Sequence, residues 1–138
     1  MTSPSFARIA LPLSILVLLL AGGPSVQAES DVIEAATLLE QLEGEAPPLV
    51  LDVRTSREFA SGHVPTARNV PVQELEDVLP DLRREIESGR PVVVYCERGG
   101  RASRAESMLR DAGFSSILHL KGDMSGWRSE GRPISIPQ

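Results

Sequence analysis

The chain has 138 residues, is 41% hydrophobic but only 4% aromatic, and carries a formal net charge of -5. This length and composition favour a single globular domain with an aliphatic core and exclude global disorder. The acidic balance argues against a dedicated nucleic-acid binder. One cysteine with two histidines excludes an internal disulfide and argues against a metal centre.

Residues 1–28 have the layout of a secretory signal. Arg8 gives a positive start, an apolar run that contains a proline follows over residues 9–21, and residues 26–28 (VQA) place small or short side chains where a signal peptidase reads. The alternative is an uncleaved membrane anchor, but a spanning helix needs about 20 apolar residues. We therefore expect cleavage after residue 28, a mature periplasmic domain of residues 29–138, and no membrane contact after cleavage.

The first half of the mature chain alternates helical and strand patterns. Apolar residues three or four positions apart predict a helix over 31–43, with Ser30 as its N-cap. Residues 49–53 (LVLDV) are short, apolar and preceded by prolines, which is typical of a buried strand. Thr55 and Glu58 have the spacing of a capping box, which predicts a short helix beginning there.

The middle of the chain contains the clearest strand. Residues 69–70 indicate a short strand between turn signals, and the apolar spacing over 72–87 predicts a helix. Pro80 is expected to break that helix into two pieces, because proline has no N–H and clashes with the preceding turn. Residues 92–95 (VVVY) form a continuous run rich in β-branched residues, typical of a strand buried on both faces.

The last third predicts one more helix–strand pair. A helix is expected over 102–112 and a strand over 116–120, and the glycine-rich tail is interpreted as loop with at most one helical turn. Helices alternating with short buried strands imply an α/β fold, with a parallel sheet covered by helices on both faces. Active sites of such folds lie at the carboxyl ends of the strands.

The chemistry is expected in the segment between the strand 92–95 and the helix after it. This segment runs Cys96-Glu97-Arg98-Gly99-Gly100-Arg101. Its two glycines let successive N–H groups converge at a helix N-terminus, while its two arginines add fixed positive charge. A thiol held there is expected to be largely thiolate, and the same donors would bind a substrate anion. The alternative is that Cys96 is a buried structural thiol.

The length of this loop bears on the kind of reaction. Cys96 and Arg101 are spaced C-x4-R, whereas cysteine phosphatases and arsenate reductases need C-x5-R, which would place Ala102 at the arginine position. The shorter loop disfavours those enzymes. It suits a smaller reacting centre, such as a single sulfur atom on the thiol.

Five segments in order resemble the rhodanese (thiosulfate sulfurtransferase) domain family. They are LDVR with EF (51–54, 58–59), GHVP through ARNVP (62–71), the strand and loop ending at Arg101 with Ser103, LKG (120–122) with Trp127, and GRP (131–133). The resemblance implies a rhodanese-like fold with a central five-stranded parallel sheet and helices on both faces. The chain is similar to small single-domain periplasmic members of that family.

The resemblance also implies an activity and roles for individual residues. Cys96 would carry a persulfide, taking sulfur from a small anionic donor such as thiosulfate and passing it to cyanide or a thiol, without metal or organic cofactor. A sulfur carrier or partner-binding module without thiosulfate turnover is the alternative. Residues 97–101 would bind the donor, Arg54 and Lys121 are possible pocket-rim residues, and Asp52 is interpreted as a buried charge partner for a loop arginine.

Three positions depart from the pattern that the chain resembles. Thr66 replaces a usual glycine in a turn, and Asp123 replaces the second glycine of the closing pair, near the expected pocket rim. Glu97 places a negative charge directly after the nucleophile, where Arg98 is expected to neutralise part of it. His119 is expected to pack on its strand, which leaves Lys121 as the better rim residue.

Overall fold

The computed structural model describes residues 31–86 and 89–137. The predicted signal peptide and Ser30 lie outside these residues. Within the described part of the chain, no helix is both long enough and apolar enough to cross a membrane.

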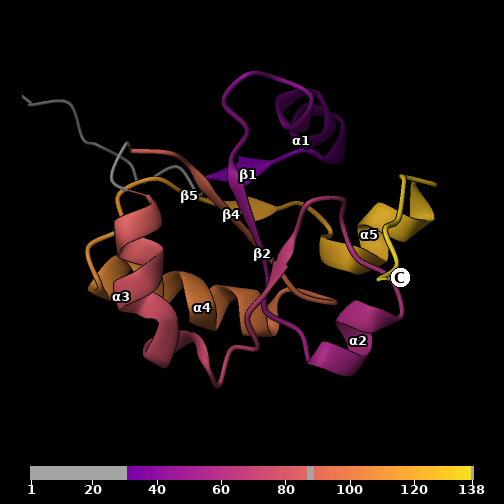
Figure 1. Cartoon of the computed structure of the whole chain (residues 1–138). Coiled ribbons are helices and arrows are strands. Elements are labelled where there is room, and N and C mark those ends of the chain that lie inside the picture. The colour runs from indigo at the N-terminus through magenta and orange to yellow at the C-terminus, as the bar shows by residue number, and fades with distance from the viewer. Residues whose placement is uncertain (1–30, 87–88, 138) are drawn as a thin grey trace, which may run out of the picture.

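The core of the fold is one sheet of five parallel strands in the order β1-β5-β4-β2-β3, so the predicted α/β architecture is confirmed (Figure 1). The strands are β1 (Val32–Ile33), β2 (Leu49–Asp52), β3 (Arg68–Asn69), β4 (Val92–Tyr95) and β5 (Ile117–Leu120). The helices are α1 (Ala35–Leu42), α2 (Ser56–Ala60), α3 (Leu75–Glu85), α4 (Gly100–Asp111) and α5 (Asp123–Ser129).

Helices cover both faces of the sheet. Buried residues of α3 and α4 form one core with alternate residues of the strands, and those of α1 and α5 form the other. In the central strand β4, Val92 and Val94 belong to the first core, whereas Val93 and Tyr95 belong to the second. This alternation explains why β4 is apolar at every position and why it could be recognised from the sequence.

The prediction of a helix over 31–43 is wrong for its first residues. Val32 and Ile33 form the edge strand β1, paired with His119 and Leu120 of β5, and α1 begins only at Ala35. Both residues are β-branched and suit a strand. Pairing with β5 satisfies backbone groups on both strands, and this tertiary contact overrides the helical spacing of the apolar residues.

The predicted break at Pro80 is also wrong, because α3 is continuous and contains this proline. Leu75 and Leu82 are fully buried, which anchors the helix on both sides of the proline. Pro80 and Glu76, whose carbonyl loses its helical partner, are exposed, so that water can satisfy the carbonyl. Packing therefore offsets a cost of about 3 kcal/mol.

The glycine-rich tail contains the seven-residue helix α5, where the sequence predicts a loop with at most one helical turn. Gly122 adopts a left-handed conformation (φ 75°) that turns the chain into α5, and Met124 and Trp127 are fully buried against the sheet. Thr66 and Asp123, the two residues found in place of expected glycines, have φ values of 66° and 54°. Both therefore occupy backbone conformations in which a side chain costs free energy.

Candidate active site

Cys96 follows β4 directly and lies at the carboxyl edge of the sheet, with 2% of its surface exposed. Its backbone is held on both sides. The N–H donates to Oδ1 of Asp123 at 2.9 Å, and the carbonyl accepts from the N–H of Met124 at 3.0 Å. The start of α5 therefore fixes the position of the cysteine.

The turn after Cys96 aims a backbone donor at its sulfur. The N–H of Gly99 donates to Sγ of Cys96 at 3.0 Å, immediately before the first turn of α4. Gly99 has a φ of 106°, and a Cβ at this position would lie 3.2 Å from Oδ2 of Asp123. Only glycine fits this conformation and spacing without strain. The partial positive charge of the α4 N-terminus adds to the donor and favours an anionic sulfur.

Arg101 is held beside the turn by Glu58 of α2. The two side chains form a bidentate ion pair, with N···O distances of 2.7 and 2.8 Å and about one third of each side chain exposed. The hydrogen bond from Arg101 is the main cause that lowers the pKa of Glu58 to about 2, and Thr55 donates to the same carboxylate. Glu58 raises the pKa of Arg101, and the charge of Cys96 adds to this effect.

Glu97 is neutralised by residues other than Arg98. Its carboxylate accepts from Nη1 of Arg54 at 3.3 Å and from Nη1 of Arg128, in α5, at 2.6 Å. Arg98 is exposed. The sequence predicts Arg98 as the partner of Glu97. Arg54 and Arg128 could not be predicted, because their contact with Glu97 depends on how β2 and α5 pack.

A buried ion pair lies beneath the loop. Asp52 and Arg54 are both fully buried, with Nη2 of Arg54 2.7 Å from Oδ2 of Asp52, and the hydroxyl of Tyr95 donates to the same oxygen at 2.6 Å. Nη2 of Arg54 also donates to the carbonyl of Gly62 at 2.8 Å. Burial raises the pKa of Tyr95, and Asp52 adds to the effect. Arg54 is therefore not an exposed rim residue, because Asp52 and Gly62 draw its guanidinium inward.

The other residue expected at the rim, Lys121, pairs instead with Glu34 at 2.6 Å, and 63% of its side chain is exposed. The side chain that contacts the loop from β5 is His119, whose Nε2 lies 3.0 Å from Oδ2 of Asp123. A Cβ on Gly99 would lie 3.7 Å from the His119 ring. The sequence signal for this contact is Asp123, an acidic residue four positions after His119 that replaces an expected glycine.

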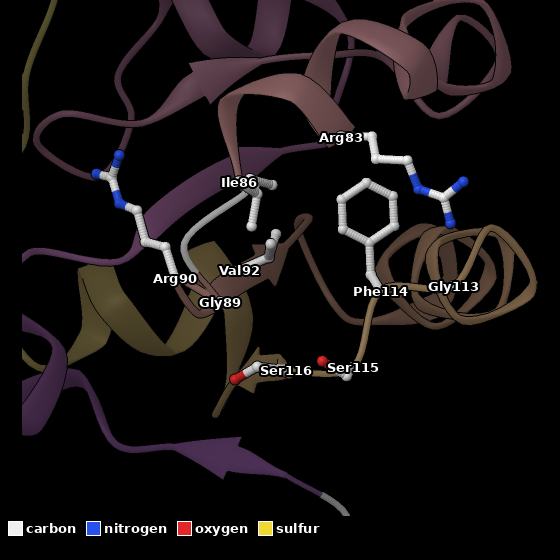
Figure 2. Close-up of a pocket in the computed structure, with 9 residues that line it drawn as sticks. All are labelled: Arg83, Ile86, Gly89, Arg90, Val92, Gly113, Phe114, Ser115 and Ser116. Atoms are coloured by element: carbon white, nitrogen blue, oxygen red, sulfur yellow. The ribbon is translucent and has the colours of Figure 1, made fainter.

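A cavity of about 210 Å³ lies at the opposite, amino edge of the sheet (Figure 2). It is bounded by Val92 at the start of β4 and by Ser116, which precedes β5, with the ring of Phe114 and the guanidinium of Arg83 to one side. None of the site residues predicted from the sequence lines it. No group of acidic, histidine or cysteine side chains that could hold a metal ion occurs in 31–86 and 89–137.

The geometry defines a class of protein, an α/β domain with a parallel sheet and a hydrogen-bonded cysteine at the carboxyl edge of that sheet. The model of the rhodanese-like domain matches residues 34–130, so the chain belongs to this family. A sulfurtransferase of Allochromatium vinosum is 32% identical over 77% of this chain and 95% of its own length. Thiosulfate sulfurtransferase 16 of Arabidopsis thaliana is 33% identical over 60% of this chain and 76% of its own length.

The solved structures agree with this assignment. A rhodanese-related protein from Thermoplasma volcanium has a TM-score of 0.65 and 29% identity, over 77% of this chain and 98% of that one. The chain also matches two further curated relatives, but it spans only 59% and 56% of their lengths. The family is thus established for residues 34–130 of the chain.

Proposed function

We propose that the protein is a sulfurtransferase that moves one sulfur atom from thiosulfate or a similar donor to a thiol or cyanide through a persulfide on Cys96. The observation that carries this proposal is the hydrogen bond from the N–H of Gly99 to Sγ of Cys96 at 3.0 Å, at the N-terminus of α4. The names of the Allochromatium and Arabidopsis relatives support the same class of reaction.

The reaction would proceed in two displacements. The Cys96 thiolate attacks the outer sulfur of thiosulfate, a new S–S bond forms, and the S–S bond of thiosulfate breaks to release sulfite. The terminal sulfur of the persulfide then carries the negative charge, which the Gly99 N–H and the α4 N-terminus stabilise. Attack by cyanide or a thiolate on that sulfur releases thiocyanate or a new persulfide and restores the Cys96 thiolate.

A second function, sulfur carriage or partner binding without thiosulfate turnover, is favoured by one observation. The guanidinium of Arg101 is held in a bidentate ion pair with Glu58. Its charge is therefore already paired, which weakens the capture of a dianion such as thiosulfate. A neutral or thiol-derived persulfide donor would be affected less.

Intact mass spectrometry after incubation with separate donors tests the two functions. A gain of one sulfur atom from thiosulfate, discharged by cyanide with release of thiocyanate, supports the enzyme. Loading only from a low-molecular-weight persulfide supports the carrier, and no adduct from any donor supports the binding module. Cys96→Ala and Cys96→Ser are the controls, because neither can form a persulfide. Any loading above background on either folded variant would contradict the proposed nucleophile.

We also propose that residues 1–28 direct the protein to the periplasm and are then removed. The support is the positive start, the apolar run and the small residues before position 29. N-terminal sequencing of protein from a periplasmic fraction is expected to begin at Glu29. A membrane-bound form that retains Met1 would contradict the proposal.

A further inference from the structure

Three charged side chains from three elements meet behind the active-site loop, and the proposed reaction uses none of them. The His119 ring, on β5, lies between the carboxylates of Glu106, on α4, and Asp123, at the start of α5. The two ring nitrogens face opposite carboxylates, Nδ1 towards Glu106 and Nε2 towards Asp123 at 3.0 Å. The polar atoms of the three side chains do not converge on one point, so they do not form a metal site. The two carboxylates instead act as a clamp that holds the ring between them.

Asp123 connects this cluster to both ends of the active-site turn. Its Oδ1 accepts the N–H of Cys96 at 2.9 Å, while its Oδ2 contacts His119 and lies 3.2 Å from where a Cβ of Gly99 would be. Its side chain is 5% exposed and its φ is 54°, so the fold accepts backbone strain to keep a carboxylate here. The position of the Asp123 carboxylate therefore affects both Cys96, which carries Sγ, and Gly99, whose N–H donates to that sulfur.

The charges around His119 favour its protonated form. The hydrogen bond to Asp123 is the main cause that raises the pKa of His119 to about 9, and Glu106 adds to it. The cation that pairs with Glu106 on its other side is Arg110, at 3.5 Å. Among the neighbouring segments, the carbonyl of Asp31 accepts the backbone N–H of His119, and Gly99 lies beside the His119 ring. At neutral pH an imidazolium therefore offsets the carboxylate beside the nucleophile.

We infer that His119 is a positioning residue for Cys96, clamped between Glu106 and Asp123 so that the Asp123 carboxylate stays on the Cys96 N–H with its charge cancelled. The inference rests on the proposed role of Cys96 as nucleophile. Without the imidazolium, Asp123 would be an uncompensated anion beside the thiolate. At an effective dielectric constant of about 40, one charge roughly 6 Å from a thiolate changes the ratio of thiolate to thiol about tenfold.

The test measures the reactivity of the Cys96 thiol, which does not require sulfur transfer. His119→Gln keeps a hydrogen-bond donor for Asp123 but cannot become charged. It is expected to slow alkylation of Cys96 by iodoacetamide by up to about tenfold in rates followed from pH 5 to pH 7, with the full effect at the pH values where the thiol is mostly protonated. Arg68→Gln, which removes a cation from the exposed pair with Glu85, is the matched control and is expected to alkylate at the rate of the unmodified protein. An unchanged rate in folded His119→Gln would overturn the inference.

A double variant separates this role from a general loss of packing. Asp123→Asn keeps an oxygen for the Cys96 N–H but removes the charge that His119 cancels. In that background, His119→Gln is expected to change the alkylation rate by less than about twofold. A tenfold effect that persists without the Asp123 charge would contradict the clamp.

A direct titration keeps the inference testable even if His119→Gln does not fold. The ring carbon signals of His119, followed by NMR in the unmodified protein, are expected to titrate near pH 9 and at lower pH in Glu106→Gln. Titration near pH 6.5, the ordinary value for histidine, would overturn the inference. Failure of every sulfur donor to load Cys96 would instead refute the proposed function and leave these measurements unaffected.

Discussion

The ion pair between Glu58 and Arg101 provides a direct test of how Arg101 is held beside the Cys96 turn. Glu58→Gln keeps the shape of the side chain and an oxygen for the N–H of Thr55, so the capping box of α2 can persist. The variant removes only the charge opposite Arg101. We expect the free energy of unfolding to fall at neutral pH.

The size and the pH dependence of this loss follow from the pKa of Glu58, which is about 2 in the folded protein against an ordinary value of 4.5. Without screening, a shift of this size corresponds to roughly 3 kcal/mol. Because about one third of each side chain is exposed, solvent screening reduces the expected loss to about 1 kcal/mol. The folded pKa is depressed, so the stabilisation is complete above pH 4.5 and is lost as the pH falls through about 2.

Urea unfolding at pH 7, 5, 4 and 3 measures this dependence. The difference between Glu58→Gln and the unmodified protein should be largest at pH 7 and should shrink at the lowest pH. Glu85→Gln, in the exposed pair with Arg68 at 2.7 Å, is the matched control and should cost less than about 0.5 kcal/mol. A loss that is independent of pH, or equally large in the control, would refute the electrostatic reasoning.

Three further predictions test the loop itself. Arg101→Lys should reduce sulfur loading from thiosulfate much more than Arg98→Lys, because lysine cannot reproduce the planar fork, and equal losses would argue that neither arginine faces the sulfur. Glu97→Ala should increase thiosulfate capture a few-fold, up to about 30-fold, because it removes a carboxylate and releases Arg128 from its ion pair, with a gain that shrinks as salt rises; weaker capture at every ionic strength would contradict this reasoning. Gly99→Ala should abolish loading, whereas Gly100→Ala, whose Cβ would meet open space, should retain most of it in the same mass assay.

Much of the fold could be predicted from the sequence because the decisive signals are local. The β4 run of buried residues, the capping box at Thr55 and the turn glycines each act within a few positions. The edge strand β1 and the helix α5 were missed because their stability comes from distant partners. Val32 and Ile33 gain strand pairing from β5, and Trp127 gains a buried site against the sheet.

In the candidate site, too, some features could be predicted from local sequence and others depend on tertiary packing. The order of residues from Cys96 to Arg101 indicates an anion-binding turn, because a strand end, two glycines and a helix start are adjacent in sequence. Which way the side chains turn is a tertiary property. Arg54 lies beneath the loop because Asp52 draws it inward, and His119 meets the loop because α4 and α5 supply its carboxylates. Neither outcome follows from spacing along one strand.

The sheet has two edge strands, β1 and β3, and each is only two residues long. The inner strands β2, β4 and β5, which are longer and more apolar, are each paired on both sides. Unpaired backbone at a sheet edge is what lets chains add to one another strand by strand. The folded domain offers little such backbone at either edge, so its architecture resists aggregation through edge-to-edge pairing even though the inner strands are apolar enough to aggregate if exposed.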